Sequence, residues 1–243
     1  MKQLAIISFL ALLGICFSCK NKEIVRAKDI PEAVKSYVYA YTAGVISKAA
    51  PVRIRFAGAA VGEDKVGKEA GGILSFTPSV SGEAIWEDDH TLRFEPEEGW
   101  ESGTAYIAKV ALDEVFDNLP KEAESFEFDF LVREQGLTVA IEGIEPEPGG
   151  EATDLSKQQL TGSISTNDQV ENEKMEQVLT VKQGGKELPL TWEHTTDGSS
   201  HEFTATGVVR SDKASELTVA WNGKPVGVKT KGEQKVEVPA LGD

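Results

Sequence analysis

Cysteine is almost absent from this sequence. Cys16 and Cys19 lie near the N-terminus, and no cysteine follows them in a chain of 243 residues. A chain without further cysteines forms no disulfides between its strands, so each domain must be stabilised by its own apolar core. It also offers no thiol for catalysis or for a cysteine-containing zinc site. This absence excludes thiol enzymes and disulfide-rich scaffolds.

Basic residues are also scarce. The chain has 25 Lys and Arg against 40 Asp and Glu, which gives a formal net charge of -15. Such a surface repels nucleic acid and anionic lipid headgroups. We therefore expect no nucleic-acid partner, and any membrane attachment must come from acyl chains. Acidity also keeps a protein soluble, which explains this composition without a specific ligand.

Residue patterns that carry catalysis or bind metals are missing. Of the three histidines, His90 follows two aspartates in a turn, and His194 and His201 flank a short loop. Two histidines across a loop could bind a metal, but no HExxH or comparable ligand spacing accompanies them. The sequence contains no Gly-x-Ser-x-Gly motif and no phosphate-binding glycine loop. We therefore predict no enzymatic activity, no catalytic residue, no metal site and no cofactor.

Acidic residues cluster in two segments, 58–72 and 95–101. A carboxylate pair could act as acid and base, and oxygen ligands at regular spacing could bind calcium. The first segment lacks that regular spacing, and the second combines its glutamates with a proline and a glycine. We interpret them as a loop and an exposed turn.

The N-terminus carries the one long apolar run. After Lys2, residues 4–17 are apolar except for Ser8 and Gly14. A helix of roughly 14 residues spans ~21 Å, which is short of the ~30 Å hydrocarbon core of a bilayer. This length favours a signal peptide over a transmembrane helix.

The apolar run ends in Phe17-Ser18-Cys19, and charged residues follow. A small residue directly before a cysteine resembles a lipobox, in which the cysteine thiol is diacylated and becomes the new N-terminus. Cys16 departs from this pattern, because such boxes usually carry Leu there. We predict a signal peptide at residues 1–18, lipidation of Cys19, and a tether at residues 19–44 that holds the protein to a membrane of the bacterial envelope. The alternative is an ordinary signal peptide that is cut nearby.

From about Val45 onward, apolar and polar residues alternate with a period of two. Val52, Ile54 and Phe56 alternate with arginines, which is typical of a half-buried strand. Turn residues separate further segments of this kind. We expect these strands at 74–77, 83–86, 91–95, 104–112, 126–132, 137–141, 160–166, 179–182, 187–192, 203–209, 217–221 and 226–230. Short strands at this spacing predict β-sandwiches rather than βα units.

The chain divides near residues 134–136. Each half has about 90–105 residues, a usual size for an immunoglobulin-like sandwich. We predict an all-β chain of two tandem immunoglobulin-like β-sandwich domains, at 45–134 and 136–243, after the lipoprotein signal peptide. One short helix is expected in the second domain near 169–177, because Asp168 and Glu171 fit a capping box. Asn222-Gly223 predicts a tight hairpin.

A spaced motif in the first half carries a family resemblance. Its residues are Phe76, Pro78, Val80, Gly82, Trp86, Asp88, Asp89, Thr91, Leu92, Phe94, Pro96, Trp100, Gly103, Thr104 and Tyr106. This motif resembles the first domain of bacterial alpha-2-macroglobulin-family lipoproteins, although related adhesin and S-layer domains share much of it. The second half is similar to the following domain at 154–157, 183–186 and 228–240. The large apolar residues of the motif, Trp86, Leu92, Phe94 and Tyr106, are predicted to fill a core.

The resemblance implies a role in protease trapping. In that family a bait region is cleaved, the molecule closes around the protease, and in many members a Cys-x-Glu-Gln thioester tethers it. Residues 231–234 contain Gly-Glu-Gln without the cysteine, so we expect a charged turn there and no thioester. We expect the anchor-proximal structural part of such an inhibitor, truncated before the bait region, which would meet proteases only through domains beyond residue 243. The alternative is an independent immunoglobulin-like adhesion or glycan-binding lipoprotein.

Overall fold

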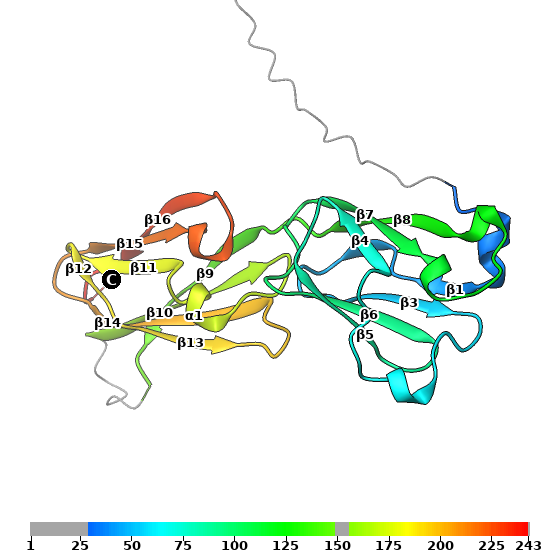
Figure 1. Cartoon of the computed structure of the whole chain (residues 1–243). Coiled ribbons are helices and arrows are strands. Elements are labelled where there is room, and N and C mark those ends of the chain that lie inside the picture. The colour runs from blue at the N-terminus through cyan, green and yellow to red at the C-terminus, as the bar shows by residue number, and fades with distance from the viewer. Residues whose placement is uncertain (1–28, 149–155, 243) are drawn as a thin grey trace, which may run out of the picture.

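The computed structural model describes residues 29–148 and 156–242. The predicted signal peptide and Cys19 lie outside these residues. Within them the chain is all-β, with sixteen strands arranged in four sheets of four strands each. Two sheets belong to each half of the chain, and the two halves lie end to end (Figure 1). Each half has its own cluster of buried apolar residues, so each is a separate sandwich domain.

The first domain pairs one sheet of order β1-β3-β6-β5 with one of order β2-β8-β7-β4. Its strands are β1 (Val38–Tyr41), β2 (Gly44–Ile46), β3 (Val52–Phe56), β4 (Leu74–Thr77), β5 (Gly82–Trp86), β6 (Thr91–Pro96), β7 (Ala105–Ala111) and β8 (Ser125–Val132). β2 runs parallel to β8, and the other pairs are antiparallel. Phe126, Phe128 and Phe130 alternate along β8 and are buried, because successive side chains of a strand point to opposite faces.

The second domain pairs a sheet of order β13-β14-β10-β9 with one of order β12-β11-β15-β16. Its strands are β9 (Leu137–Pro146), β10 (Lys157–Thr166), β11 (Leu179–Gln183), β12 (Lys186–Glu187), β13 (Leu190–His194), β14 (Ser200–Val209), β15 (Ser215–Asn222) and β16 (Lys231–Val238). All of these pairs are antiparallel. Leu160, Phe203 and Leu217 lie in the core between the sheets.

The four predicted core residues of the first motif, Trp86, Leu92, Phe94 and Tyr106, are confirmed as buried. The turns that separate them are also observed. Trp86 faces Leu92 across a hairpin whose turn holds Asp88 and Asp89. Gly103, which precedes β7, has a φ of 68°, a left-handed conformation that glycine adopts without strain.

The fold prediction needs a correction, because helical turns occur in both domains rather than once in the second. They are the 3-10 helices η1 (Glu32–Ser36), η2 (Glu63–Lys65), η3 (Leu112–Glu114), η4 (Lys121–Ala123) and η5 (Lys224–Val226), and the α-helix α1 (Asn172–Met175). Pro31 and Pro120 directly precede η1 and η4, and their fixed φ favours a turn there. The predicted helix at 169–177 is only one turn long. The structure supports the coarser description of an all-β chain built from four sheets.

The described part of the predicted tether belongs to the first sandwich. Val34 in η1 is fully buried, and Ile30, Tyr37 and Val38 pack against the same core. β1 continues this segment and pairs with β3. The prediction of a tether up to residue 44 is therefore wrong from residue 30 onward. The apolar residues are spaced as in a helix and lie among charged residues, so the strand pattern did not include them.

This boundary gives a direct test with two fragments. A fragment of residues 29–135 is expected to unfold cooperatively on its own. A fragment of residues 45–135 loses Val34 and Val38 from the core and exposes the edge of β3 that pairs with β1, while β3 keeps its pairing with β6. Its free energy of unfolding should therefore fall by about 3 kcal/mol or more. Urea denaturation followed by circular dichroism measures both values. Equal stability of the two fragments would contradict the corrected boundary.

Two predictions near the C-terminus are also wrong. The predicted tight hairpin at Asn222-Gly223 is a longer connection that contains η5, and the next strand begins only at Lys231. Residues 231–234, expected in a charged turn, form the first half of β16 and pair with β15. The strand expected at 226–230 is therefore shifted toward the C-terminus.

Candidate functional site

A buried aspartate connects the two domains. Asp168 lies between β10 and α1 in the second domain, and only 4% of its surface is exposed. Its Oδ1 accepts a hydrogen bond from the Ser47 hydroxyl at 2.6 Å, and its Oδ2 accepts one from the Lys48 amide at 2.7 Å. Oδ1 also accepts a bond from the amide of Gln169 at 2.9 Å. The carboxylate thus binds donors from both domains and is held in one orientation.

The linker between the domains adds a second set of hydrogen bonds. The Gln135 side chain donates from Nε2 to the Asp168 carbonyl at 3.0 Å and accepts at Oε1 from the Asp168 amide at 3.0 Å. Asn167 donates from Nδ2 to the Glu134 carbonyl at 3.1 Å. We call Ser47, Lys48, Gln135, Asn167 and Asp168 the interdomain joint. Its bonds join the ends of the two sandwiches at three separate points of the chain.

Trp100 supports the first-domain side of the interdomain joint. Its backbone amide donates to the Lys48 carbonyl at 2.8 Å, and its indole Nε1 donates to the Ala50 carbonyl at 2.8 Å. Gly99 precedes it with a φ of 77°, and a Cβ at this position would lie 3.0 Å from the Lys48 carbonyl oxygen. Only glycine fits this close approach without strain. The tryptophan thus fixes the segment that carries Ser47 and Lys48.

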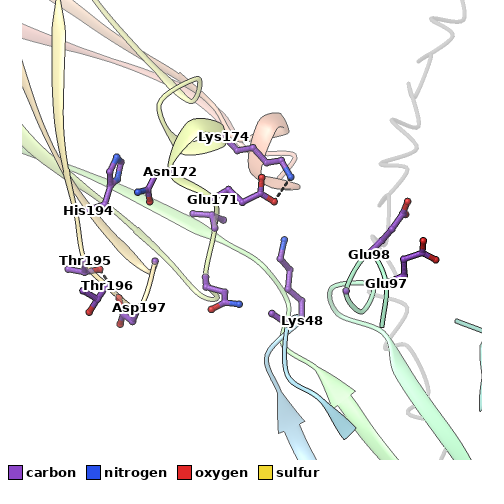
Figure 2. Close-up of a pocket in the computed structure, with 15 residues that line it drawn as sticks. Lys48, Glu97, Glu98, Glu171, Asn172, Lys174, His194, Thr195, Thr196 and Asp197 are labelled. Carbon is purple, nitrogen blue, oxygen red and sulfur yellow. Dashed lines mark hydrogen bonds and ion pairs between the residues drawn. The ribbon is translucent and has the colours of Figure 1, made fainter. Parts of the chain in front are cut away.

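A groove of about 960 Å³ opens beside the interdomain joint (Figure 2). The charged side chains that line it are Lys48, Glu97 and Glu98 from the first domain, and Glu171, Lys174, His194 and Asp197 from the second. Figure 2 shows Lys48 extending into the groove toward the ion pair of Glu171 and Lys174, which are 2.7 Å apart. The groove therefore presents charges of both signs.

Hydrogen bonds keep two groove carboxylates ionised. The Lys174 ammonium donates to Glu171, and this bond lowers the pKa of that carboxyl below its usual value. The hydroxyl of Thr195 lowers the pKa of Asp197, and Ser199 lowers it further through its hydroxyl and amide. Both carboxyls have a lowered pKa and already accept bonds from neighbouring residues, so neither suits a general base at neutral pH. The groove is suited to hold a polar ligand by hydrogen bonds and charge.

The histidines considered as metal ligands lie in two places. His90 forms a close group with Asp88 and Asp89, and their ligand atoms lie within 4.8 Å of one another. Asp88 accepts bonds from the His90 amide and from the Thr91 hydroxyl, and the first of these chiefly lowers its pKa. The Asp89 carboxylate contacts His90 Nδ1 at 2.7 Å. These contacts close the turn between β5 and β6.

Sequence reasoning misassigned the central residue of this site. Asp168 was predicted to form a capping box with Glu171, but α1 begins at Asn172 and Glu171 precedes it without a side-chain capping bond. The Asp168 carboxylate is bonded instead to residues of the first domain. Gln135, which was predicted only as part of the domain boundary, is the second residue that sequence reasoning missed.

The predicted membrane anchor at Cys19 lies outside the described residues. In the described ranges, none of the helices is long and apolar enough to cross a membrane. Attachment through Cys19 stays a prediction.

Comparisons with known proteins give only distant likenesses. No family model and no curated protein matches the chain. An L,D-transpeptidase from Mycobacterium smegmatis is 12% identical over 84% of this chain and 73% of its own, with a TM-score of 0.31. The N-terminal part of the bacterial S-layer protein SbsC is 15% identical over 84% of this chain and 43% of its own, with a TM-score of 0.29. The eight N-terminal immunoglobulin domains of the Down syndrome cell adhesion molecule are 14% identical over 84% of this chain and 24% of their own, with a TM-score of 0.27. These likenesses carry no argument about activity and give no indication of the alpha-2-macroglobulin family.

Proposed function

We propose that this chain is a rigid structural module of a lipid-anchored bacterial envelope protein, the anchor-proximal part of an alpha-2-macroglobulin-like protease inhibitor. The observation that carries the structural role is the interdomain joint. Domains that share one chain usually move relative to one another unless their interface fixes them. Here a buried carboxylate accepts two bonds from the other domain.

The arrangement of the domains supports a spacer role. The ribbon begins beside β1 at the outer end of the first sandwich and ends at the outer end of the second sandwich (Figure 1). A rigid joint between two sandwiches therefore keeps whatever is attached at one end at a constant distance from the other end. For a protein anchored at Cys19, this distance separates the distal end from the membrane.

The anchor itself is tested by changing Cys19→Ala. The parent chain, expressed in a bacterium fed with labelled palmitate, is expected to carry the label, and the variant is expected to lose it completely. Cys16→Ala serves as the matched control and should keep the label, because only the cysteine after Ser18 fits the lipobox. Label on the Cys19→Ala variant, or none on the parent, would show that the anchor is absent.

The link to protease inhibitors is tested by the coding sequence downstream of codon 243. Continuation in frame into a long β-rich chain with a bait segment supports the proposal. A terminator followed by an unrelated gene contradicts it. A separate assay mixes the present chain with proteases of several classes and a large protein substrate. We expect no protection of that substrate, and stoichiometric protection would contradict a purely structural role.

The groove favours a second candidate function, adhesion to a glycan or another polar polymer. It is formed by both domains and lined by charged groups and hydroxyls. A glycan array probed with the soluble chain separates the candidates. Binding that is lost in Lys48→Ala would favour adhesion over the spacer role.

A further inference from the structure

Two histidines face each other at the edge of the groove. His194 on β13 is directly opposite His201 on β14, and their Nδ1 atoms are 2.7 Å apart. His201 is fully buried, whereas His194 reaches the groove. The outer nitrogen of His194, Nε2, lies 3.3 Å from a carboxylate oxygen of Glu176. The pair therefore extends from the groove into the core of the second domain.

This geometry admits one shared proton but not two. A hydrogen bond between two Nδ1 atoms needs one nitrogen with a hydrogen and one without. If both rings are protonated, two N–H groups and two positive charges face each other at this distance. The other nitrogen of His201, Nε2, is buried and has no hydrogen-bond partner within residues 29–148 and 156–242, so a charge on this ring is poorly compensated.

Burial lowers the pKa of His201, and the charge of His194 lowers it further. The carbonyl of Gly198 and the carboxylate of Asp197 oppose this shift more weakly. An unfolded histidine keeps its ordinary pKa of about 6.5. The unfolded state therefore binds more protons than the folded state as the pH falls below that value, and stability is lost toward acid pH.

The charged groups around the pair do not remove the repulsion between two protonated rings. They are Glu171, Lys174 and Glu176 in and around α1, Asp197 in the loop, and Lys48, Glu97 and Glu98 across the groove. Glu176 contacts Nε2 of His194 and can compensate a positive charge on that ring. On the remaining side of His201, β10 presents the apolar Ile164. A positive charge on His201 therefore has no carboxylate in contact with it among the described residues.

The loop between the two histidines lies against the interdomain joint. The amide of Val170 donates to the Gly198 carbonyl at 2.9 Å, and the amide of Thr166 donates to the Ser199 carbonyl at 2.8 Å. A Cβ on Gly198 would lie 3.1 Å from the Val170 carbonyl oxygen, so the two segments are in close contact. Thr166 directly precedes Asn167 and Asp168, and Val170 follows Asp168 by two residues. A change in this loop therefore acts directly on the residues that hold the two domains together.

We propose that the His194–His201 pair is an acid-sensitive switch that loosens the interdomain joint when both rings become protonated. Separation of the rings breaks the end of the β13–β14 ladder and displaces the loop from Val170. The segment that follows Asp168 then loses its hydrogen bond to the loop, from the amide of Val170 to the carbonyl of Gly198. Asp168 is no longer held in place, and the two domains move independently. This inference goes beyond the spacer role and rests on the joint alone, so it holds with or without the lipid anchor or the link to inhibitors.

Amide hydrogen exchange of the full chain, measured residue by residue at pH 7.5 and pH 5.0, tests the switch. Each rate is divided by the intrinsic rate at that pH, which leaves the protection of each amide. We expect the protection of Lys48, Asp168 and Val170, whose amides bond across or beside the joint, to fall at least tenfold at pH 5.0. Unchanged protection in the parent chain would overturn the proposal.

Variants of the two histidines test whether the pair causes the loss of amide protection at pH 5.0. His194→Gln and His201→Phe each remove one of the two facing charges, so the acid loss of protection should shrink to less than twofold. If His201→Phe does not fold, His194→Gln still gives the test, because its side chain lies at the groove. His90→Asn, which changes the histidine of the first domain, should keep the full response. A full response in His194→Gln, or its loss in His90→Asn, would show that another group titrates and would refute the switch.

Discussion

The variant Asp168→Ala is expected to release the two domains from their fixed arrangement and to lower the free energy of unfolding by about 2–5 kcal/mol. The substitution removes an acceptor that serves the Ser47 hydroxyl and the amides of Lys48 and Gln169. A buried donor left without a partner costs about 1–3 kcal/mol. These donors are only partly buried or exposed, so water recovers part of this cost. Small-angle X-ray scattering should show a broader distribution of interdomain distances, and urea denaturation gives the change in stability.

Two matched variants sharpen this test. Glu171→Ala removes a nearby carboxylate whose ion pair with Lys174 is exposed, so its effect should stay within about 0.5 kcal/mol. Asp168→Asn keeps one acceptor oxygen and should have an intermediate effect. If the scattering curve of Asp168→Ala is the same as that of the parent, then the hydrogen bonds of Asp168 do not fix the domains and the spacer proposal loses its basis.

The capping role predicted for Asp168 is wrong because the sequence pattern describes only local geometry. An aspartate three residues before a glutamate is typical of a helix start, and that spacing is present here. The partner that decides its role, Ser47, is 121 residues away in the chain. No periodicity of a single sequence records a contact over that separation. The fold prediction could therefore include the strands on either side of the joint but not the bonds within it.

The core was predictable because its signal is local and repeated. Trp86, Leu92 and Phe94 belong to two strands joined by a short turn, and both their alternation and the turn residues can be read within a few positions. Gly223 shows the opposite case. Asn-Gly predicted a turn that needs a positive φ, but Gly223 has a φ of -71°. It is required by close packing, because a Cβ would lie 2.8 Å from side-chain atoms of Leu137 and Val228. A glycine required for space and one required for φ look the same in a sequence.

Trp100→Ala is expected to cause the largest loss of stability in the first domain, about 3–5 kcal/mol. The indole is buried, and its ring centroid lies within 5.0 Å of the rings of Phe76, Tyr106 and Phe130. Removing it leaves a cavity among these rings and leaves the Ala50 carbonyl without its donor. Thermal and urea unfolding of the parent and the variant measure this loss. Trp192→Ala, in the partly buried edge strand β13, is the matched control and should leave the first domain's transition unchanged.

The conservative variant Trp100→Phe separates packing from hydrogen bonding. It keeps an aromatic ring in the cluster but cannot donate to Ala50, so we expect a smaller loss of about 1–3 kcal/mol. Because Trp100 also fixes the segment 47–50, both variants should reduce the protection of the Lys48 amide, which bonds to Asp168 in the other domain. Such a reduction would mean that the core of the first domain sets the geometry of the joint. If stability falls while the Lys48 amide keeps its full protection, the joint is held by Asp168 and the linker alone, and Trp100 acts only within its own sandwich.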